Sequence, residues 1–394
     1  MSGVIQSSIR SAKAIWRRLP VAVRVALPLF LAVRIGLSLF AVTSLQVFPA
    51  VEVPAEYWRG IEPVTEGVHG WLLGPWQRWD TLWYLRIASL GYDPTDGSTA
   101  FFPLYSLVIR LLARPLKDDY LLAAMLISNL ACLGAAILLY KITNLEFDHG
   151  SARRAVVYQL LFPTAFFLFA PYTESLFLLW ATASLYSARR GKWWWAGSFG
   201  FLAGLTRLTG AALALPLLYE MWRRNDRRLD RFPLRWASIG LPFLGLAVYS
   251  LYLYARFGNP LLWLNIQGQG IWTRSFAWPW DTAYQIVASL FQPPNNAIDL
   301  LLTLLFIFLT ILAFKKLRAT YGLYMLLSML PPLLRPRAGA PLCSMPRFVL
   351  VLFPSFMVLG QIGKKPLWHR LILYNSLLFL TFFTALFVAW YWVA

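Results

Sequence analysis

Long apolar segments recur along the chain, and they limit its fold more than any other feature does. A helix that crosses a lipid bilayer needs about 20 mostly apolar residues. Only 13% of the 394 residues are charged, whereas soluble proteins have about 25%. The chain therefore has too little charge to cover a surface that faces water. We predict an all-α polytopic membrane protein whose residues 1–394 form a single integral membrane domain.

Eleven candidate spans remain when the chain is divided at its charged and Pro/Gly-rich breaks. They lie near residues 21–45, 119–140, 156–170, 174–188, 194–206, 209–222, 236–255, 297–314, 319–334, 347–363 and 371–392. Short segments meet at two junctions, Pro171 to Glu174 and Thr206 to Thr209. The helices at these junctions are either short spans or re-entrant hairpins.

Charge placement predicts the orientation of these spans. One set of alternate breaks, with the N-terminus, carries 22 Lys and Arg against five acids, while the opposite side carries 12 of each. Cytoplasmic loops have an excess of Lys and Arg. We therefore expect the N-terminus in the cytoplasm and the C-terminus on the extracytoplasmic side. The net charge of +19 reflects this topology, and no nucleic-acid partner is expected.

Two breaks on the extracytoplasmic side are long, residues 46–118 and residues 256–296. Long loops within a compact domain are usually functional. The first loop is rich in acids and has five tryptophans, which suit helices lying at the level of the lipid headgroups. We expect the first loop to hold the catalytic motif.

The densest group of polar and aromatic residues lies at positions 77–92, around Asp80. Burial among aromatic rings disfavours a carboxylate unless a cation or a hydrogen-bond donor supports it. Arg78 and Arg86 are close enough in sequence to do so. Two interpretations of Asp80 stay open: it caps a helix that begins at Thr81, or it is a catalytic base.

Motifs of soluble enzymes are missing from the sequence. It contains no GxGxxG after a strand, no GxxxxGK[ST], no HExxH and no GxSxG, and its three histidines are scattered. No metal ligand is assigned on this basis. Asp93 and Asp96 are weak candidates for binding a divalent ion, but Asp is also common in Pro/Gly turns of this kind. The cofactor is therefore left open.

Residues 77–105 resemble the first luminal loop of the PIG-V family, the enzymes that add the second mannose in GPI-anchor assembly, and of their prokaryotic relatives. The resemblance rests on RWD at 78–80, GY at 91–92 and FFPLY at 101–105. Further blocks similar to the family follow in the family's order, at 162–177, 205–210, 258–272 and 344–354. An ordered series of this kind is more specific than any single block.

The resemblance implies a GT-C-like bundle of about 11 transmembrane helices, with interfacial helices in the first outer loop. It also implies an inverting, mannosyltransferase-like enzyme. Such an enzyme moves a sugar, typically mannose, from a polyprenyl-phosphate donor to a hydroxyl of a lipid or glycan acceptor at the extracytoplasmic face. The membrane would be the cell membrane of a prokaryote or the endoplasmic reticulum of a eukaryote.

This chemistry needs a carboxylate for the acceptor proton, cations for the leaving phosphate, and aromatic surface for sugar and lipid. Asp80 is the candidate general base. Arg207 and Arg347 are the candidates for the donor phosphate; the alternatives are an ion pair between Arg207 and Glu174, and snorkelling of Arg347 to the headgroups. The candidates for acceptor or sugar binding are Glu174, Arg78, Tyr84, Tyr92, Tyr172, Gln267 and Trp272.

A lipid-linked sugar flippase or secondary transporter is the alternative function. It would also be polytopic, basic inside and rich in aromatic residues. A transporter places ionisable groups near the midplane of broken helices, whereas the informative acids of this chain cluster in an outer loop.

Overall fold

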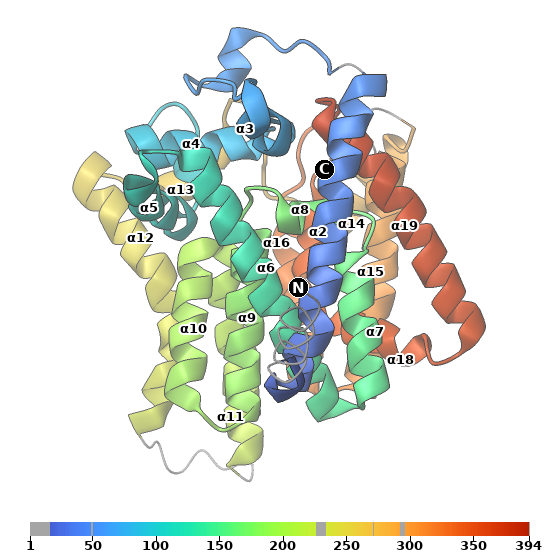
Figure 1. The fold of residues 1–394 in the computed structure, drawn as a ribbon. Helices are drawn as coiled ribbons and strands as arrows, with labels where there is room; N and C mark the ends of the chain where they lie inside the picture. The colour runs from blue at the N-terminus through green and yellow to red at the C-terminus, as the bar shows by residue number, and fades with distance from the viewer. Residues whose placement is uncertain (1–15, 49, 226–233, 271, 292–295, 394) are drawn as a thin grey trace, which may run out of the picture.

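The computed structural model describes residues 16–48, 50–225, 234–270, 272–291 and 296–393, and these residues form helices and turns without a named strand. Long helices lie side by side in one bundle, and shorter helices cover one end of it (Figure 1). The bundle consists of α2 (Val21–Val47), α6 (Tyr120–Glu146), α7 (His149–Leu160), α9 (Glu174–Arg189), α10 (Trp193–Thr206), α11 (Ala214–Arg224), α12 (Leu241–Phe257), α15 (Asn296–Lys316), α16 (Ala319–Leu334), α17 (Met345–Phe348), α18 (Phe353–Ile362) and α19 (Pro366–Val388). The predicted all-α fold is confirmed.

Five helical segments of the described residues are long and apolar enough to cross a membrane, or six if a pair bent by 77° is one span. The five are Val21–Val47, Tyr120–Glu146, Leu234–Phe257, Asn296–Lys316 and Pro366–Val388, and the bent pair joins Met345–Val351 to Phe353–Ile362. With 27 residues, α2 is about 40 Å long, which exceeds the roughly 30 Å of a hydrocarbon core. The protein is therefore an integral membrane protein.

Helices cover most of the predicted spans, but two are broken. The predicted span 347–363 is divided at Leu352, where the helical pair bends by 77°. The predicted span 156–170 is wrong, because α7 ends at Leu160 and the short helix α8 (Phe166–Phe169) follows as a separate element. Pro163 lies in the break between them. Proline has no N–H to donate and disfavours helical backbone in the residue before it, so an apolar run alone does not continue the helix.

Helices α10 and α12 pack closely because glycine lies where their backbones meet. A Cβ added to Gly204 of α10 would lie 2.4 Å from the Pro242 carbonyl oxygen, and one added to Gly245 of α12 would lie 2.5 Å from the Phe201 oxygen. Small residues allow such close approach between membrane helices. These contacts hold α12 against the end of α10 that precedes Arg207.

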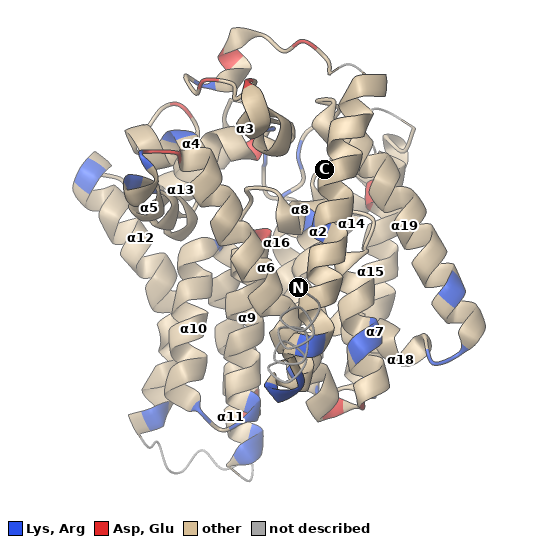
Figure 2. Cartoon of the chain, viewed as in Figure 1, with Lys and Arg blue, Asp and Glu red and all other residues tan. Residues whose placement is uncertain are grey.

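Ion pairs join four helices at the end of the bundle opposite α3 and α4 (Figure 2). Arg189 of α9 contacts Glu146 of α6 and Glu220 of α11, the latter at 3.2 Å between Nη1 and Oε1. Arg318, just before α16, lies 3.7 Å from Glu146 and 3.5 Å from Glu220. Glu220 is fully buried. Because Arg189 and Arg318 both contact the same two acids, the cluster holds α6, α9, α11 and α16 together.

The first long loop folds into helices, as the resemblance implies. These are α3 (Gly67–Leu73), α4 (Asp80–Leu90) and α5 (Pro103–Ala113), which lie across one end of the bundle (Figure 1). The second long loop contains α13 (Leu262–Asn265) and α14 (Pro279–Ala288). Helix α13 packs against the 3-10 turn Ser98–Ala100 of the first loop, so the two loops meet at this end.

Candidate active site

Asp80 is the first residue of α4, and an unusual turn points it into the protein. The preceding residue, Trp79, has a positive φ of 50°, which is rare outside glycine and is found where surrounding contacts enforce it. The Tyr172 hydroxyl holds this turn, since it donates to the Arg78 carbonyl at 3.2 Å and accepts from the Asp80 N–H at 3.3 Å. Only 9% of Asp80 is exposed. The helix begins at Asp80 with Trp79 as its N-cap, so Asp80 is not the cap of a helix starting at Thr81.

Four charged side chains form an alternating series at the site. Arg347 Nη1 lies 2.6 Å from Asp80 Oδ2, and Arg347 Nε lies 2.7 Å from Glu174 Oε1. The same Glu174 oxygen accepts from Arg207 Nη1 at 2.6 Å. Glu174 is fully buried, and the other side chains are at most 14% exposed. A buried charge without a partner is costly. Each charged side chain of the series is therefore stabilised in its buried position by the neighbouring charges.

The sequence expectation for the partner of Asp80 is wrong. Arg86 pairs with Asp96 at 2.8 Å instead, and Arg78 donates to backbone carbonyls, those of Val388 and Gly74 at 2.8 Å each. The cation beside Asp80 is Arg347, which is 267 residues away in sequence. The turn at Trp79 explains the difference, because it directs the side chains of positions 78 and 80 to different sides.

A cavity of about 210 Å³ opens next to Asp80. Six of the residues expected at the site line it: Asp80, Tyr84, Arg207, Gln267, Trp272 and Arg347. Thr173 and Ser344 add hydroxyl groups, and Phe101 and Trp392 add aromatic surface. The structure thus brings together parts of both long loops, the break after α10 and the start of α17.

Four of the expected residues lie outside the lining of this cavity. Glu174 stands behind Arg207 and Arg347, and Tyr172 supports the Trp79 turn. The Tyr92 hydroxyl donates to the Phe101 carbonyl at 2.9 Å, so it supports a loop that lines the cavity. The fourth, Arg78, faces a second cavity.

Two arginines of the cavity were missed by the sequence analysis. Arg274 donates to the carbonyls of Arg335 and Cys343 at 3.2 Å each, and Arg335 donates to the Arg274 carbonyl at 3.3 Å. Neither has an acidic partner within the described part of the chain, and Nε of Arg335 is buried without a hydrogen bond there. Burial lowers the pKa of both groups from the ordinary arginine value. No local sequence pattern marks an arginine in a loop as part of a cavity. The only available signal was that these two cations of the outer segments had no assigned role.

The weak candidates for a divalent ion have local roles. Asp96 pairs with Arg86, and Asp93 accepts from the Thr95 N–H at 2.8 Å within the same turn. These turn hydrogen bonds lower the pKa of Asp93. Within the described ranges there is no group of three or more His, Cys, Asp or Glu that could hold a metal ion.

The sequence profile of the family described as Mannosyltransferase (PIG-V) matches residues 60–219. This range includes Asp80, Glu174 and Arg207, and it ends before Arg274 and Arg347. Three of the charged groups at the site therefore lie in the part of the chain that resembles the family, whereas the cations from later segments lie outside it.

Curated relatives match over part of their length. The GPI alpha-1,6-mannosyltransferase 2 of Rattus norvegicus is 31% identical over 214 residues, which cover 48% of this chain and 42% of that protein. The Homo sapiens protein of the same description is 28% identical over 225 residues, covering 51% and 44%. GPI mannosyltransferase 2 of Yarrowia lipolytica is 29% identical over 144 residues, covering 36% and 40%. The matched parts make up less than half of each relative.

Among solved structures, ArnT from Cupriavidus metallidurans, bound to undecaprenyl phosphate, aligns with 92% of this chain and 76% of that chain, at 12% identity and a TM-score of 0.49. The family resemblance rests on the sequence comparisons. Over residues 60–219, this chain is similar to the PIG-V mannosyltransferases, as its sequence motifs predict.

Proposed function

We propose that the protein is a membrane-embedded glycosyltransferase that moves a sugar, most simply mannose, from a polyprenyl-phosphate donor to a hydroxyl of a lipid or glycan acceptor. In this proposal Asp80 is the general base. The main support is that one cavity is lined, among the described residues, by a single carboxylate and four arginines: Asp80 with Arg207, Arg274, Arg335 and Arg347. Base and phosphate-binding cations therefore share one site, as transfer from a sugar phosphate requires.

The geometry at Asp80 suits proton transfer. Its Oδ2 pairs with Arg347, while Oδ1 makes no hydrogen bond within the described part of the chain. That oxygen can receive the proton of an acceptor hydroxyl. The acceptor oxygen then forms a bond to the anomeric carbon of the sugar as the bond from that carbon to the donor phosphate oxygen breaks. A single displacement of this kind inverts the anomeric configuration.

The arginines stabilise the charge that develops on the leaving phosphate. Guanidinium groups bind phosphate oxygens through two parallel hydrogen bonds. Arg207 and Arg347 are held by Glu174, so they are already oriented before a donor arrives. Among the described residues, the hydrogen bonds of Arg274 and Arg335 go to carbonyl groups, so both offer uncompensated positive charge to an anion. Electrostatic preorganisation of this kind usually contributes most to catalysis.

Mannose transfer by the purified protein tests this function. In detergent, with polyprenyl-phosphate [³H]mannose and a glycolipid extract as acceptor, a labelled product more polar than the acceptor is expected. Parallel assays with EDTA and with added Mg²⁺ test whether a divalent ion is needed. If the protein instead moves the labelled lipid across liposomes and forms no product, it is a flippase and the proposal fails.

Arg274→Gln and Arg335→Gln are expected to weaken donor use. A hydrogen bond to a charged group contributes about 1.5–3 kcal/mol, so each loss should raise the KM for the donor about 10- to 100-fold. The acceptor KM should change little. Steady-state kinetics with varied donor measures this, and Arg256→Gln, an exposed arginine at the end of α12, is the matched control. An unchanged donor KM in both variants would remove these residues from the phosphate site.

The proposal places the site on the extracytoplasmic side. Its support is the charge distribution. Acids are common at the end of the bundle that carries α3 and α4, whereas Lys and Arg gather at the opposite end (Figure 2). We expect a cysteine at position 66 to react with a membrane-impermeant maleimide in intact cells, and one at position 364 to react only after permeabilisation. Both positions are exposed, and both native cysteines are buried. Reversed labelling would put the site in the cytoplasm.

A further inference from the structure

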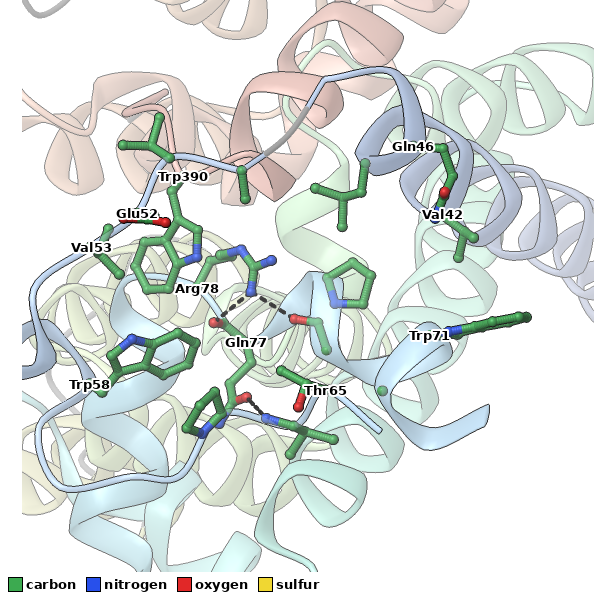
Figure 3. A pocket seen from close by; sticks show the side chains of 18 residues that line it. Val42, Gln46, Glu52, Val53, Trp58, Thr65, Trp71, Gln77, Arg78 and Trp390 are labelled. Atoms are coloured by element: carbon green, nitrogen blue, oxygen red, sulfur yellow. Dashed lines mark hydrogen bonds between the residues drawn. The ribbon is translucent and has the colours of Figure 1, made fainter. Parts of the chain in front are cut away.

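A second and larger cavity lies on the other side of the Trp79 turn. Its volume is about 540 Å³. Its walls come from the outer end of α2, two loop segments before α3, the middle of α3, the turn that follows α3, and Trp390 after α19 (Figure 3). The indole rings of Trp58, Trp71 and Trp390 line it, together with the polar side chains of Gln46 and Thr65. Neither the family resemblance nor the transfer reaction accounts for this space.

A buried cation faces this cavity. Arg78 is 6% exposed, and Figure 3 shows its guanidinium group beside Trp390 among the lining side chains. Its hydrogen bonds go to the carbonyls of Val388, Gly74 and Gln77, and its charge lies 5.1 Å from the centre of the Trp390 ring. All these partners are neutral. Burial lowers the pKa of Arg78 to about 10, so the group is still protonated at neutral pH.

No acid compensates this charge within the described part of the chain. Glu52 also lines the cavity, but it is exposed and forms no ion pair with Arg78 there. A buried cation without an anion is costly unless a ligand supplies one. The cavity therefore favours an anionic group, held beside aromatic surface that suits the apolar faces of a sugar or an acyl chain.

Apolar side chains are exposed beside the cavity. Val47, the last residue of α2, and Phe48, which follows it, are 69% and 60% exposed, and Trp71, which lines the cavity, is 68% exposed. Exposed apolar residues at the end of a spanning helix are expected to contact lipid. The anion that reaches Arg78 is therefore expected to come from the membrane.

A thin wall of indole rings separates the two cavities. Trp79 contacts Trp390 at 5.4 Å and Trp392 at 5.1 Å between ring centres. Trp390 lines the larger cavity, and Trp392 lines the cavity of Asp80. Residues two apart in a chain have Cα atoms at most about 7 Å apart, so Arg78 and Asp80 mark neighbouring points on the two sides of this wall.

We propose that the larger cavity binds the headgroup phosphate of a lipid-anchored acceptor, with Arg78 as the cation that recognises it. This inference rests on the proposed function. The lipid tails lie toward the apolar rim of α2, and the glycan of the acceptor passes the Trp79–Trp390–Trp392 wall to present a hydroxyl to Asp80. The acceptor class is therefore a phosphate-bearing glycolipid rather than a neutral glycolipid or a soluble sugar.

Equilibrium binding to the full-length protein in detergent tests the site without relying on activity. The probes are short-chain phosphatidylinositol, a short-chain diacylglycerol galactoside that has no phosphate, and inorganic phosphate. The wild type should bind the phospholipid at least tenfold more tightly than the galactoside. Arg78→Gln should remove this preference, Arg78→Lys should keep part of it, and Arg256→Gln should leave it unchanged. In transfer assays, Arg78→Gln should raise the acceptor KM and spare the donor KM.

A second variant covers the case in which Arg78→Gln does not fold. Trp71 is mostly exposed and lines the cavity, so Trp71→Ala should weaken phospholipid binding severalfold, whereas Trp280→Ala, an exposed tryptophan outside the cavity, should not. Equal binding of the two lipids by the wild type would overturn the inference. Inorganic phosphate that competes as strongly as the phospholipid would also overturn it, because the site would then serve free phosphate.

The outcomes separate this inference from the proposed function. Mannose transfer without Arg78-dependent lipid binding overturns the acceptor site alone. Arg78-dependent binding in a protein that transfers no mannose supports a phospholipid headgroup site and overturns the proposed function, and with it the acceptor role of that site.

Discussion

Asp80→Asn is expected to lower mannose transfer by about 10²–10⁴-fold, the usual contribution of a general base. The amide has nearly the shape of the carboxylate, but it cannot take a proton from the acceptor hydroxyl. Folding should survive the change, because Arg347 keeps its contact with Glu174 at 2.7 Å after Asp80 becomes neutral. Initial rates with saturating donor, together with the melting temperature of the same preparation, measure both parts of this prediction.

Asp93→Asn is the matched control for this prediction. Asp93 lies in the same outer loop, and its hydrogen bonds stay within its own turn: the carboxylate accepts from Thr95, and the backbone bonds with Ser98. Asparagine forms turns of this kind nearly as well, so activity and melting temperature should both stay close to wild type. If Asp80→Asn keeps activity within tenfold of wild type, Asp80 is not the base. If it unfolds the protein, its role is structural.

Glu174→Gln is expected to destabilise the protein by about 3–5 kcal/mol, the cost of breaking a buried ion pair by removing one partner. Glu174 is fully buried and is the only acid that contacts Arg207 among the described residues. The change also takes one of two acids from Arg347. Unfolding in mixed detergent and SDS micelles measures the decrease in the free energy of unfolding. The control is Glu66→Gln, since Glu66 is an exposed acid of the first outer loop.

A double variant shows whether the cost comes from the unpaired cation. When both partners of a buried pair become neutral, much of the destabilisation is recovered. Glu174→Gln combined with Arg207→Gln should therefore be more stable than Glu174→Gln alone, although it should bind donor poorly. A double variant that is less stable than either single variant would mean that Arg207 contributes through packing rather than through its charge.

Much of the fold could be predicted from the sequence because hydropathy and helix breaks are local properties. A 27-residue apolar run such as Tyr120–Glu146 has no stable alternative to a helix in lipid. Hydropathy wrongly predicts one helix over 156–170, because Pro163 interrupts the apolar run and separates α7 from α8. Length and apolarity indicate that a segment is buried, but they do not indicate where its helix ends.

The candidate site was predictable only in part. The family resemblance singled out Asp80, Glu174 and Arg207, because these residues lie in short recognisable blocks. The cation beside Asp80 was assigned wrongly, since proximity in sequence favoured Arg78 and Arg86. Ion pairs between distant segments depend on how helices pack, and no local pattern encodes that packing.

By itself, the sequence determined that this protein is a helical membrane protein with basic residues concentrated on one side and its recognisable motifs in outer segments. Composition and the order of short blocks were sufficient for that. Apart from the Arg207–Glu174 pair, which the sequence already offered as an alternative, the tertiary structure decided which charges meet. It joined Arg347 to Asp80 and Glu174, added Arg274 and Arg335 to the same cavity, and turned Arg78 toward another. The physical reason is that a buried charge must find its partner in space, and the backbone turn at Trp79 determines on which side each side chain can find one.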